Sequence, residues 1–263
     1  MFPLLRAAEA AASTPHGIFV RPSWFKPRLG PYLRRERDRR EYWRIFRAPT
    51  GADVVRRLIV VPIARRAPVG APQARVTFES GMDGYYSRFA LPGTWHRSFL
   101  ESMSRPGSLS AGHPNQPFVG FHVRLGDFAR ANDGVVASTA NNTSTPISWY
   151  VSCAQMIREL LPGVPVIVAS DGSDLELEAL LAIPDVCRSR TKNALDEMLL
   201  LSQSTALVGS RSTFTSWAAF LGEVPLLVAP GGNAYTPHGD VTEVADPRSA
   251  AGWLERALAR LQQ

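Results

Sequence analysis

The sequence predicts an α/β protein whose C-terminal half, residues 117–263, is a parallel sheet with helices on both faces. From residue 118 onward, apolar runs of strand length alternate with longer segments of helical periodicity. Parallel strands need a connection long enough to hold a helix, so this alternation is typical of βαβ units. The chain has 263 residues, 45% of them hydrophobic and 20% charged, which is enough for one large domain or two compact ones.

The first predicted elements of this half are a strand, a helix and a second strand. The run FVGFHV predicts a buried strand over 118–123, and a loop continues through residue 145. Pro146 and Ser148 suit the start of a helix over 147–161, which Pro162-Gly163 ends. The elements predicted after this helix are a strand over 164–169, helices over 174–181 and 194–202, a strand over 205–209, a helix over 214–221, a strand over 224–228 and a helix over 250–262.

The N-terminal half, residues 1–110, is predicted to be an irregular α/β unit. Residues 1–30 are rich in Ala, Pro and Gly and predict irregular structure with at most one short strand. Residues 31–47 interleave arginines with acidic and apolar residues, which predicts a helix with one charged face. The apolar run within 57–63 and a short strand over 74–79 complete the unit. A segment rich in Pro, Gly and Ser over 105–116 is the predicted linker between the halves.

The net charge indicates which kinds of partner the protein favours, and the cysteines and the N-terminus indicate its compartment. The formal net charge is +6, and 27 of the 29 basic residues are arginines, which favours anionic partners and equally follows from a GC-rich coding sequence. Two cysteines, Cys153 and Cys187, specify neither a disulfide scaffold nor a zinc site. No basic-flanked leader and no apolar run of membrane-spanning length is present, so a cytoplasmic protein is expected.

The end of the strand over 118–123 carries the most informative side chains. His122, Arg124 and Asp127 gather there, at the edge where open α/β sheets place their ligands. The guanidinium of Arg124 offers a fork of donors that suits a phosphate, and Gly126 lets the backbone turn closely beside it. These residues predict an anion site for a diphosphate. The structural alternative is a surface ion pair between Arg124 and Asp127.

A second group of polar residues precedes the helix over 214–221. Ser210, Ser212, Thr213 and Thr215 gather at its start, where backbone amides and the helix dipole favour a phosphate. The structural alternative is ordinary capping, in which one hydroxyl satisfies the helix and the others are incidental.

With these two groups in this order, the chain resembles the GDP-fucose-dependent α-1,2-fucosyltransferases. More distantly, it resembles the fucosyltransferase superfamily with the H-x-R-x-G-D strand end. The resemblance covers roughly residues 117–230. It rests on three separate blocks of residues in the right order and spacing. The matching residues are His122, Val123, Arg124, Gly126 and Asp127, then the segment PISWYVSCAQMIRELLPGVPVIVASDG, then Asp196, Met198, Leu199 and Ser202, and finally Ser212, Thr213, Phe214 and Trp217.

The resemblance implies a GT-B-like glycosyltransferase with two Rossmann-like halves, the N-terminal half reduced or divergent on the acceptor side. It implies that Arg124 grips the diphosphate of GDP-fucose and that Asp196 helps to hold the guanosine. Gly126, Ser210, Ser212 and Thr213 would line the phosphates. The transfer would invert the anomeric carbon.

The general base would be Asp127 or His122. The partners implied are a nucleotide sugar and a glycan acceptor. No cofactor and no metal is expected, since arginine and helix dipoles replace the metal. Peripheral membrane association is expected only with a lipid-linked acceptor.

Three positions depart from the family pattern. Leu125 stands where a second arginine is usual, Arg211 replaces an asparagine, and Ser216 replaces the first of two tryptophans. The glycine-rich loop near the family's N-terminus is absent. Two other functions therefore stay open. One is a non-catalytic module that binds nucleotide sugars or glycans. The other is an RNA-associated protein that uses the helix over 31–47, although acidic residues among those arginines argue against nucleic acid, and no nucleic-acid partner is expected.

Overall fold

The computed structural model describes residues 2–15, 17–21, 42–66, 89–110, 114, 116–125, 144–210, 212–230 and 240–262. The chain divides into two compact units. The first unit comprises Met1–Leu91 and Ser98–Ser108, and the second comprises Pro92–Arg97 and Leu109–Gln263. Helix α5 (Gly93–Met103) begins in the second unit and ends in the first.

In the first unit, the described residues form helices and one isolated bridge. The helices are α1 (Phe2–Ala12), α3 (Tyr42–Ile45), α4 (Gly51–Arg66) and the later part of α5. The bridge pairs Phe46 with Ser104 in antiparallel fashion. The apolar run predicted within 57–63 belongs to α4. Most of the predicted helix over 31–47 and the whole predicted strand over 74–79 lie outside the described residues.

The expectation of irregular structure over 1–30 is wrong for α1. Its sequence FPLLRAAEAAA is rich in alanine, the strongest helix former, and it carries no glycine and one proline near its start. Leu4 and Leu5 lie about one turn before Ala8 on the same face, and all three side chains are buried. The carboxylate of Glu9 accepts a hydrogen bond from the backbone amide of Ala90 at 2.6 Å, which joins α1 to the segment before α5.

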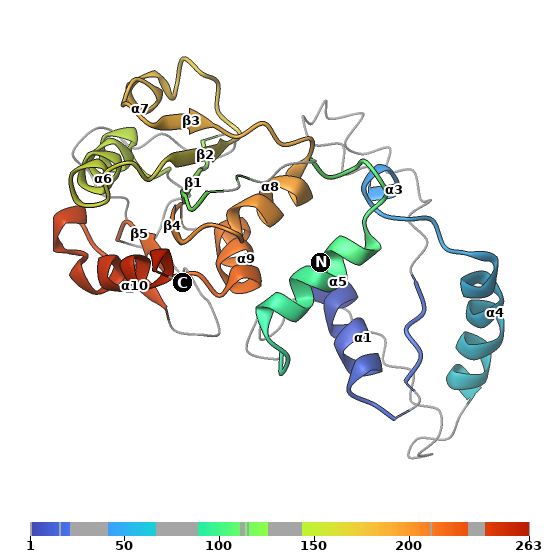
Figure 1. Ribbon diagram of the computed structural model, residues 1–263. Coiled ribbons are helices and arrows are strands. Elements are labelled where there is room, and N and C mark those ends of the chain that lie inside the picture. Colours follow the sequence, from blue (N-terminus) through green and yellow to red (C-terminus); the bar gives the residue numbers. More distant parts are fainter. Residues whose placement is uncertain are drawn as a thin grey trace. The chain divides into compact units, whose positions relative to one another are not determined.

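The second unit contains a six-stranded parallel sheet (Figure 1). Its strands are β1 (Val119–Val123), β2 (Val166–Ser170), β3 (Val186–Arg188), β4 (Ala206–Gly209), β5 (Leu226–Val228) and β6 (Val241–Glu243). The spatial order is β3-β2-β1-β4-β5-β6, so the chain changes direction across the sheet between β1 and β4. That is the strand order of the Rossmann fold, in which ligands bind beyond the carboxyl ends of the strands at this switch point.

Helices cover both faces of this sheet (Figure 1). On one side lie α6 (Ile147–Leu160) and α10 (Ala251–Leu261), and on the other lie α8 (Ala194–Leu201) and α9 (Thr213–Gly222). The short helices α7 (Glu178–Leu181) and η2 (Pro247–Ser249) complete the unit. The α/β class, with a parallel sheet and helices on both faces in the C-terminal half, is therefore confirmed.

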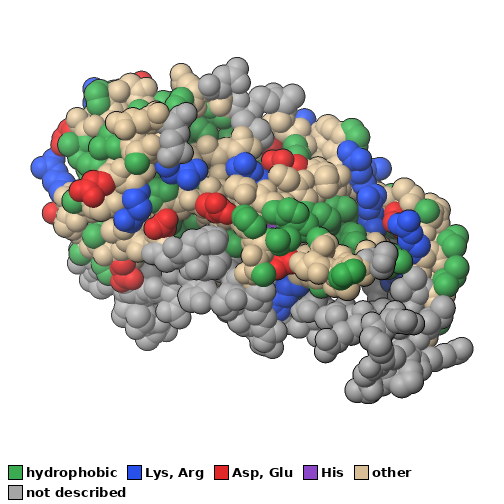
Figure 2. Space-filling model, turned by 60° about the horizontal axis from the view of Figure 1, so that its bottom comes forward, with side chains coloured by type: hydrophobic (Ala, Val, Ile, Leu, Met, Phe, Trp, Pro, Cys, Tyr) green, Lys and Arg blue, Asp and Glu red, His purple; other side chains and the backbone are tan. Residues whose placement is uncertain are grey.

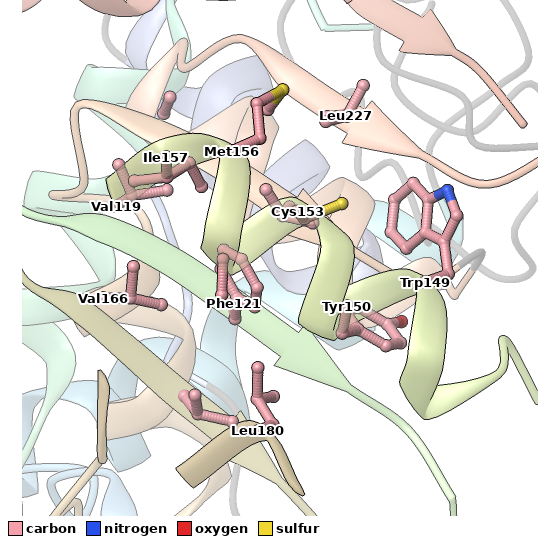
Figure 3. Packing of buried hydrophobic residues seen from close by; sticks show 14 of the residues in the cluster. Val119, Phe121, Trp149, Tyr150, Cys153, Met156, Ile157, Val166, Leu180 and Leu227 are labelled. Carbon is pink, nitrogen blue, oxygen red and sulfur yellow. The ribbon is translucent and has the colours of Figure 1, made fainter. Parts of the chain in front are cut away.

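The central strand β1 alternates between the two faces. Val119, Phe121 and Val123 pack into the main hydrophobic cluster with side chains of α6, as Figure 3 shows for the first two. Gly120 points to the opposite face, where a Cβ atom would lie 3.0 Å from the side chain of Leu201 in α8. His122 follows two residues later and therefore faces the side of α8 and α9.

Eight of the predicted elements after residue 117 are confirmed, with ends that agree to within two residues. The predicted helix over 174–181 is correct only at α7, because residues 174–177 form turns. Strands β3 and β6 are absent from the prediction. Within the described residues, no helix is both long and apolar enough to cross a lipid bilayer.

Candidate functional site

The site is built around His122, whose imidazole is buried at the carboxyl end of β1. Its Nδ1 atom lies 2.6 Å from the hydroxyl of Thr215, 3.1 Å from that of Ser210 and 3.4 Å from that of Ser212. The ring stacks on Phe214, with centroids 4.7 Å apart. These contacts connect the predicted H-x-R strand end with the predicted hydroxyl cluster, because Ser210 follows β4 and the other three residues open α9.

Two local features hold the hydroxyl cluster in place. Ser212 is the N-cap of α9, and its side-chain oxygen accepts a hydrogen bond from the backbone amide of Thr215 at 3.2 Å. Gly209, the last residue of β4, lies so close to Thr215 that a Cβ atom there would overlap the methyl group of Thr215. Ordinary capping therefore accounts for Ser212, whereas Ser210 and Thr215 turn their hydroxyls toward His122. Thr213, the first residue of the helix, is exposed.

Arg124 follows the last residue of β1, and Asp171 lies beside this segment of the chain. The carboxylate of Asp171 accepts a hydrogen bond from the backbone amide of Leu125 at 2.7 Å and lies 3.9 Å from Nη1 of Arg124. The side chain of Arg124 is 33% exposed. The guanidinium thus lies at ion-pair distance from one carboxylate and is accessible to a ligand from solvent. The predicted alternative pair with Asp127 cannot be placed, because Gly126 and Asp127 lie outside the described residues.

The loop that carries Asp171 is fastened by Arg188 at the end of β3. The guanidinium of Arg188 donates to the backbone carbonyls of Ser170 at 3.0 Å and Gly172 at 2.6 Å, and it pairs with Asp174. An arginine that binds several carbonyls of one loop restricts the conformations of that loop. Arg188 therefore positions Asp171, which in turn positions Arg124.

Burial keeps His122 neutral at physiological pH. The pKa of His122 is lowered to about 4, chiefly by burial and further by the positive charge of Arg124, while the negative charge of Asp171 opposes the shift. Arg124 lies two residues after His122, just beyond the last residue of β1. A neutral imidazole accepts at one ring nitrogen and donates at the other, so it orders the surrounding hydroxyls.

Asp196 is wholly buried, and its two carboxylate oxygens fasten two loops. One oxygen accepts from the backbone amide of Ser110 at 2.9 Å. The other accepts from the hydroxyl of Ser110 at 2.6 Å and from the backbone amide of Lys192 at 2.8 Å. The structure thus gives Asp196 three bonds within the protein, in the first turn of α8.

Glu197, which follows Asp196, is an ionisable group that the sequence reasoning missed. Its carboxylate accepts a hydrogen bond from the hydroxyl of Ser189 at 3.2 Å. Burial raises the pKa of Glu197 to about 7, and the charges of Asp171 and Asp196 add to the shift, while Ser189 and Arg188 oppose it. A carboxyl group that titrates near neutrality beside a candidate site is a functional candidate. The one sequence signal was its place next to Asp196, in the first turn of the helix predicted over 194–202.

A hollow of about 360 Å³ lies elsewhere, beside the segments that precede β1 and β4. Its lining includes Gln116, Gln203, Ser204, Thr205 and Arg260. These residues belong to the amino edge of the sheet, opposite Arg124 and His122. The carboxyl edge is the candidate site, because His122 and the hydroxyl side chains that contact it lie there.

Two further observations concern metals and surface charge. Within the described ranges, no group of three or more His, Cys, Asp or Glu side chains is arranged to hold a metal ion. On the face that Figure 2 shows, basic and acidic side chains lie side by side over the left-hand part of the view. That part of the surface therefore presents no continuous basic tract for nucleic acid.

No protein-family model and no curated protein matches the sequence. Among solved structures, the chain is similar to ADP-heptose LPS heptosyltransferase II of E. coli, with 16% identity and a TM-score of 0.40 over 74% of this chain and 56% of that chain. It is also similar to the glycotransferase of kitacinnamycin, with 15% identity and a TM-score of 0.31 over 60% of this chain and 42% of that chain. The chain spans about half the length of these structures.

Proposed function

We propose that this protein transfers fucose from GDP-fucose to a hydroxyl group of a glycan, with inversion at the anomeric carbon. The observation that carries the proposal is that Arg124 follows, two residues later at the end of β1, a buried histidine whose ring contacts three hydroxyl side chains before and at the start of α9. A cation, hydroxyl donors and a helix N-terminus at the switch point of a parallel sheet are the groups that a diphosphate requires.

Arg124 is the proposed ligand of the diphosphate. Its guanidinium lies 3.9 Å from the carboxylate of Asp171 and is partly exposed, so a phosphate can reach it from solvent. Positive charge at this position stabilises the negative charge that develops on the leaving GDP. Ser210, Ser212 and Thr213 would add hydroxyl donors, and Gly126 would let the backbone approach the phosphates. No divalent metal is required in this proposal, because arginine and the dipole of α9 supply the positive field.

The proposed reaction is a displacement at the anomeric carbon. The oxygen of the acceptor hydroxyl forms the new bond, the bond to the phosphate oxygen breaks, and GDP leaves with the electron pair. The hydroxyl proton passes to a general base. We assign this role to Asp127, because the imidazole of His122 has a pKa of about 4 and already contacts three hydroxyls. His122 is then a positioning residue that orders Ser210 and Thr215.

Asp196 is proposed to act on the guanosine indirectly. Its carboxylate fixes the backbone at Ser110 and Lys192, and the loops at these positions would form the wall against which the nucleoside rests. A buried, fully bonded carboxylate is more effective as a scaffold than as a direct ligand, because ligand binding would break bonds that are already made.

A thermal-shift screen of nucleotide sugars tests the donor. Stabilisation by GDP-fucose above that by GDP-mannose and UDP-linked sugars is expected, since a ligand that binds the folded state at a hundred times its Kd adds about 2.7 kcal/mol of stability. Equal or absent shifts with all donors would refute the proposal. Stabilisation by GDP-fucose without GDP release over an acceptor panel would instead identify a non-catalytic nucleotide-sugar-binding module.

A further inference from the structure

The hollow at the amino edge of the sheet has the size of a small-ligand pocket. Its volume is about 360 Å³, within the range of roughly 300–1,000 Å³ that such pockets span. Three elements bound it: the segment before β1, the turn between α8 and β4, and the last turn of α10 (Figure 1). All three belong to the second unit. The hollow is therefore formed within one compact unit.

Hydrogen bonds within the protein hold the walls of the hollow in place. The backbone amide and the hydroxyl of Thr205 both donate to the carbonyl of Phe118, each at 2.9 Å. These two bonds fasten the turn before β4 to the segment before β1. The hydroxyl of Ser204 donates to the carbonyl of Leu201 at 2.7 Å, which fastens the turn to the end of α8. A ligand would thus meet a preorganised wall, and little binding free energy would be lost in ordering the protein.

The lining of the hollow presents neutral hydrogen-bonding groups. The side-chain amides of Gln116 and Gln203 make no hydrogen bond to any other residue that the structure describes. Each amide supplies both donors and an acceptor oxygen. The hydroxyls of Ser204 and Thr205 use their protons within the protein and keep lone pairs that can accept. Neighbouring donors and acceptors of this kind suit the hydroxyl groups of a sugar, which also donate and accept.

Arg260, in the last turn of α10, supplies a positive charge to the hollow. Its Nη1 atom donates to the backbone carbonyl of Glu223 at 3.3 Å, and its Nη2 atom donates to that of Gly222 at 3.4 Å. A guanidinium has five N–H donors, so these two bonds leave three. Among the described residues, no carboxylate lies at ion-pair distance from Arg260, and no acidic side chain lines the hollow.

The guanidinium of Arg260 is partly removed from water. Burial lowers the pKa of Arg260 and the charge of Arg97 adds to the decrease, while the charges of Glu223 and Asp240 oppose it. The group still carries its charge at physiological pH. An anion at its remaining donors would form charge-assisted hydrogen bonds, which are roughly twice as strong as neutral ones.

We propose that the hollow binds a monosaccharide with one acidic group, its carboxylate or phosphate on Arg260 and its hydroxyls on the amides of Gln116 and Gln203. One cation suits one anionic group, and the neutral amides suit the hydroxyls. The volume lies at the lower end of the range for ligand pockets, which favours one sugar ring over an oligosaccharide. This inference does not rest on the proposed transfer of fucose, because Arg124 lies at the opposite edge of the sheet.

Isothermal titration calorimetry of the full chain with four probes tests the proposal. The probes are glucuronate, glucose 6-phosphate, glucose and inorganic phosphate. We expect at least one of the two acidic sugars to bind about tenfold or more tightly than glucose and inorganic phosphate, because it engages the guanidinium and the amides together. The tighter of the two acidic sugars identifies the anionic group as a carboxylate or a phosphate.

Two variants test the assigned contacts. Arg260→Gln should weaken binding of the acidic sugar about tenfold or more, because it removes a charge-assisted hydrogen bond. Gln203→Ala should weaken binding roughly fivefold and leave the melting temperature unchanged, since its amide bonds to no described residue. Gln203→Ala therefore keeps the test decisive if Arg260→Gln does not fold. Gln155→Ala is the matched control, because Gln155 is exposed in α6 and does not line the hollow.

Arg124→Ala should bind the acidic sugar with unchanged affinity, so failure of this site is distinguishable from failure of the proposed transfer. Absence of binding by both acidic sugars overturns the proposal. Equal affinity for inorganic phosphate also overturns it, because the hollow would then be a general anion site. So does an affinity that Arg260→Gln and Gln203→Ala leave unchanged. Loss of binding in Arg124→Ala would place the sugar at the carboxyl edge and would overturn it as well.

Discussion

The Nδ1 atom of His122 and the hydroxyl oxygen of Thr215 lie 2.6 Å apart, although the two residues are 93 positions apart in the chain. Both side chains are buried, so this contact is shielded from water. It connects the end of β1, just before Arg124, with the first turn of α9. The two predicted halves of an anion site are therefore held together by one hydrogen bond and its neighbouring hydroxyls.

Thr215→Val removes this hydrogen bond while keeping the shape of the side chain. We expect a loss of about 1–3 kcal/mol in the free energy of unfolding, because the buried imidazole loses its nearest partner. Urea denaturation measures the loss. Thr213→Val is the matched control, since Thr213 is exposed in the same helical turn and its replacement should change stability little. Equal losses in both variants would contradict the role given to the contact.

Acidification should destabilise the protein through His122. Its pKa is about 4 in the folded state and about 6.5 in an unfolded chain, so between these values the unfolded state binds a proton that the folded state does not. Stability therefore falls as pH decreases from 6.5 to 4, by about 3 kcal/mol from this residue. Denaturation at pH 7 and pH 4 should show a larger decrease for the unmodified protein than for His122→Asn. Identical decreases would show that His122 does not titrate as described.

Raising the pH should destabilise the protein through Glu197, which is the opposite of the effect of His122. Its pKa is about 7 in the folded state against 4.5 for an exposed carboxyl, so the folded state holds a proton that the unfolded state has lost. Stability therefore falls as pH rises from 4.5 through 7, by on the order of 2 kcal/mol. Glu197→Gln should be more stable than the unmodified protein at pH 8, and the difference should vanish at pH 4.5. A variant of unchanged stability at pH 8 would count against the raised pKa of Glu197.

Asp196→Asn tests the scaffold role of that carboxylate. The new amide nitrogen would face either the amide of Lys192 or that of Ser110, and neither can donate to it. We expect faster hydrogen exchange at the amides of Ser110 and Lys192 and a loss of about 1–3 kcal/mol of stability. Unchanged protection of these two amides, with weakened GDP binding, would instead support direct contact between Asp196 and guanosine.

The elements that sequence predicts well are those with long buried segments. Strand β1 has alternate apolar side chains and helix α6 has apolar side chains at helical spacing, because one face of each packs into the main core. Strands β3 and β6 have three residues each and are only partly buried, so their pattern is too short to distinguish from a loop. Helix α1 was missed because its alanines pack with little bulk, and composition alone suggested irregular structure.

The candidate site could be located from the sequence where the type of side chain indicates its chemistry. Arg124 and the hydroxyls of Ser210 and Ser212 fall at strand and helix ends that the sequence locates. The partnership of Arg124 with Asp171, and the burial of Glu197, depend on how loops after three different strands fold together. Those relationships arise from tertiary packing, which no local pattern records.

The central claim is that Arg124 binds and neutralises a diphosphate leaving group. Release of GDP from GDP-fucose, together with calorimetric binding of GDP, tests it most directly. Arg124→Ala should bind GDP weakly and lose at least a hundredfold in turnover, whereas Arg248→Ala, which removes an exposed arginine paired with Glu159, should retain both. Near-normal GDP affinity and turnover in Arg124→Ala would contradict the account.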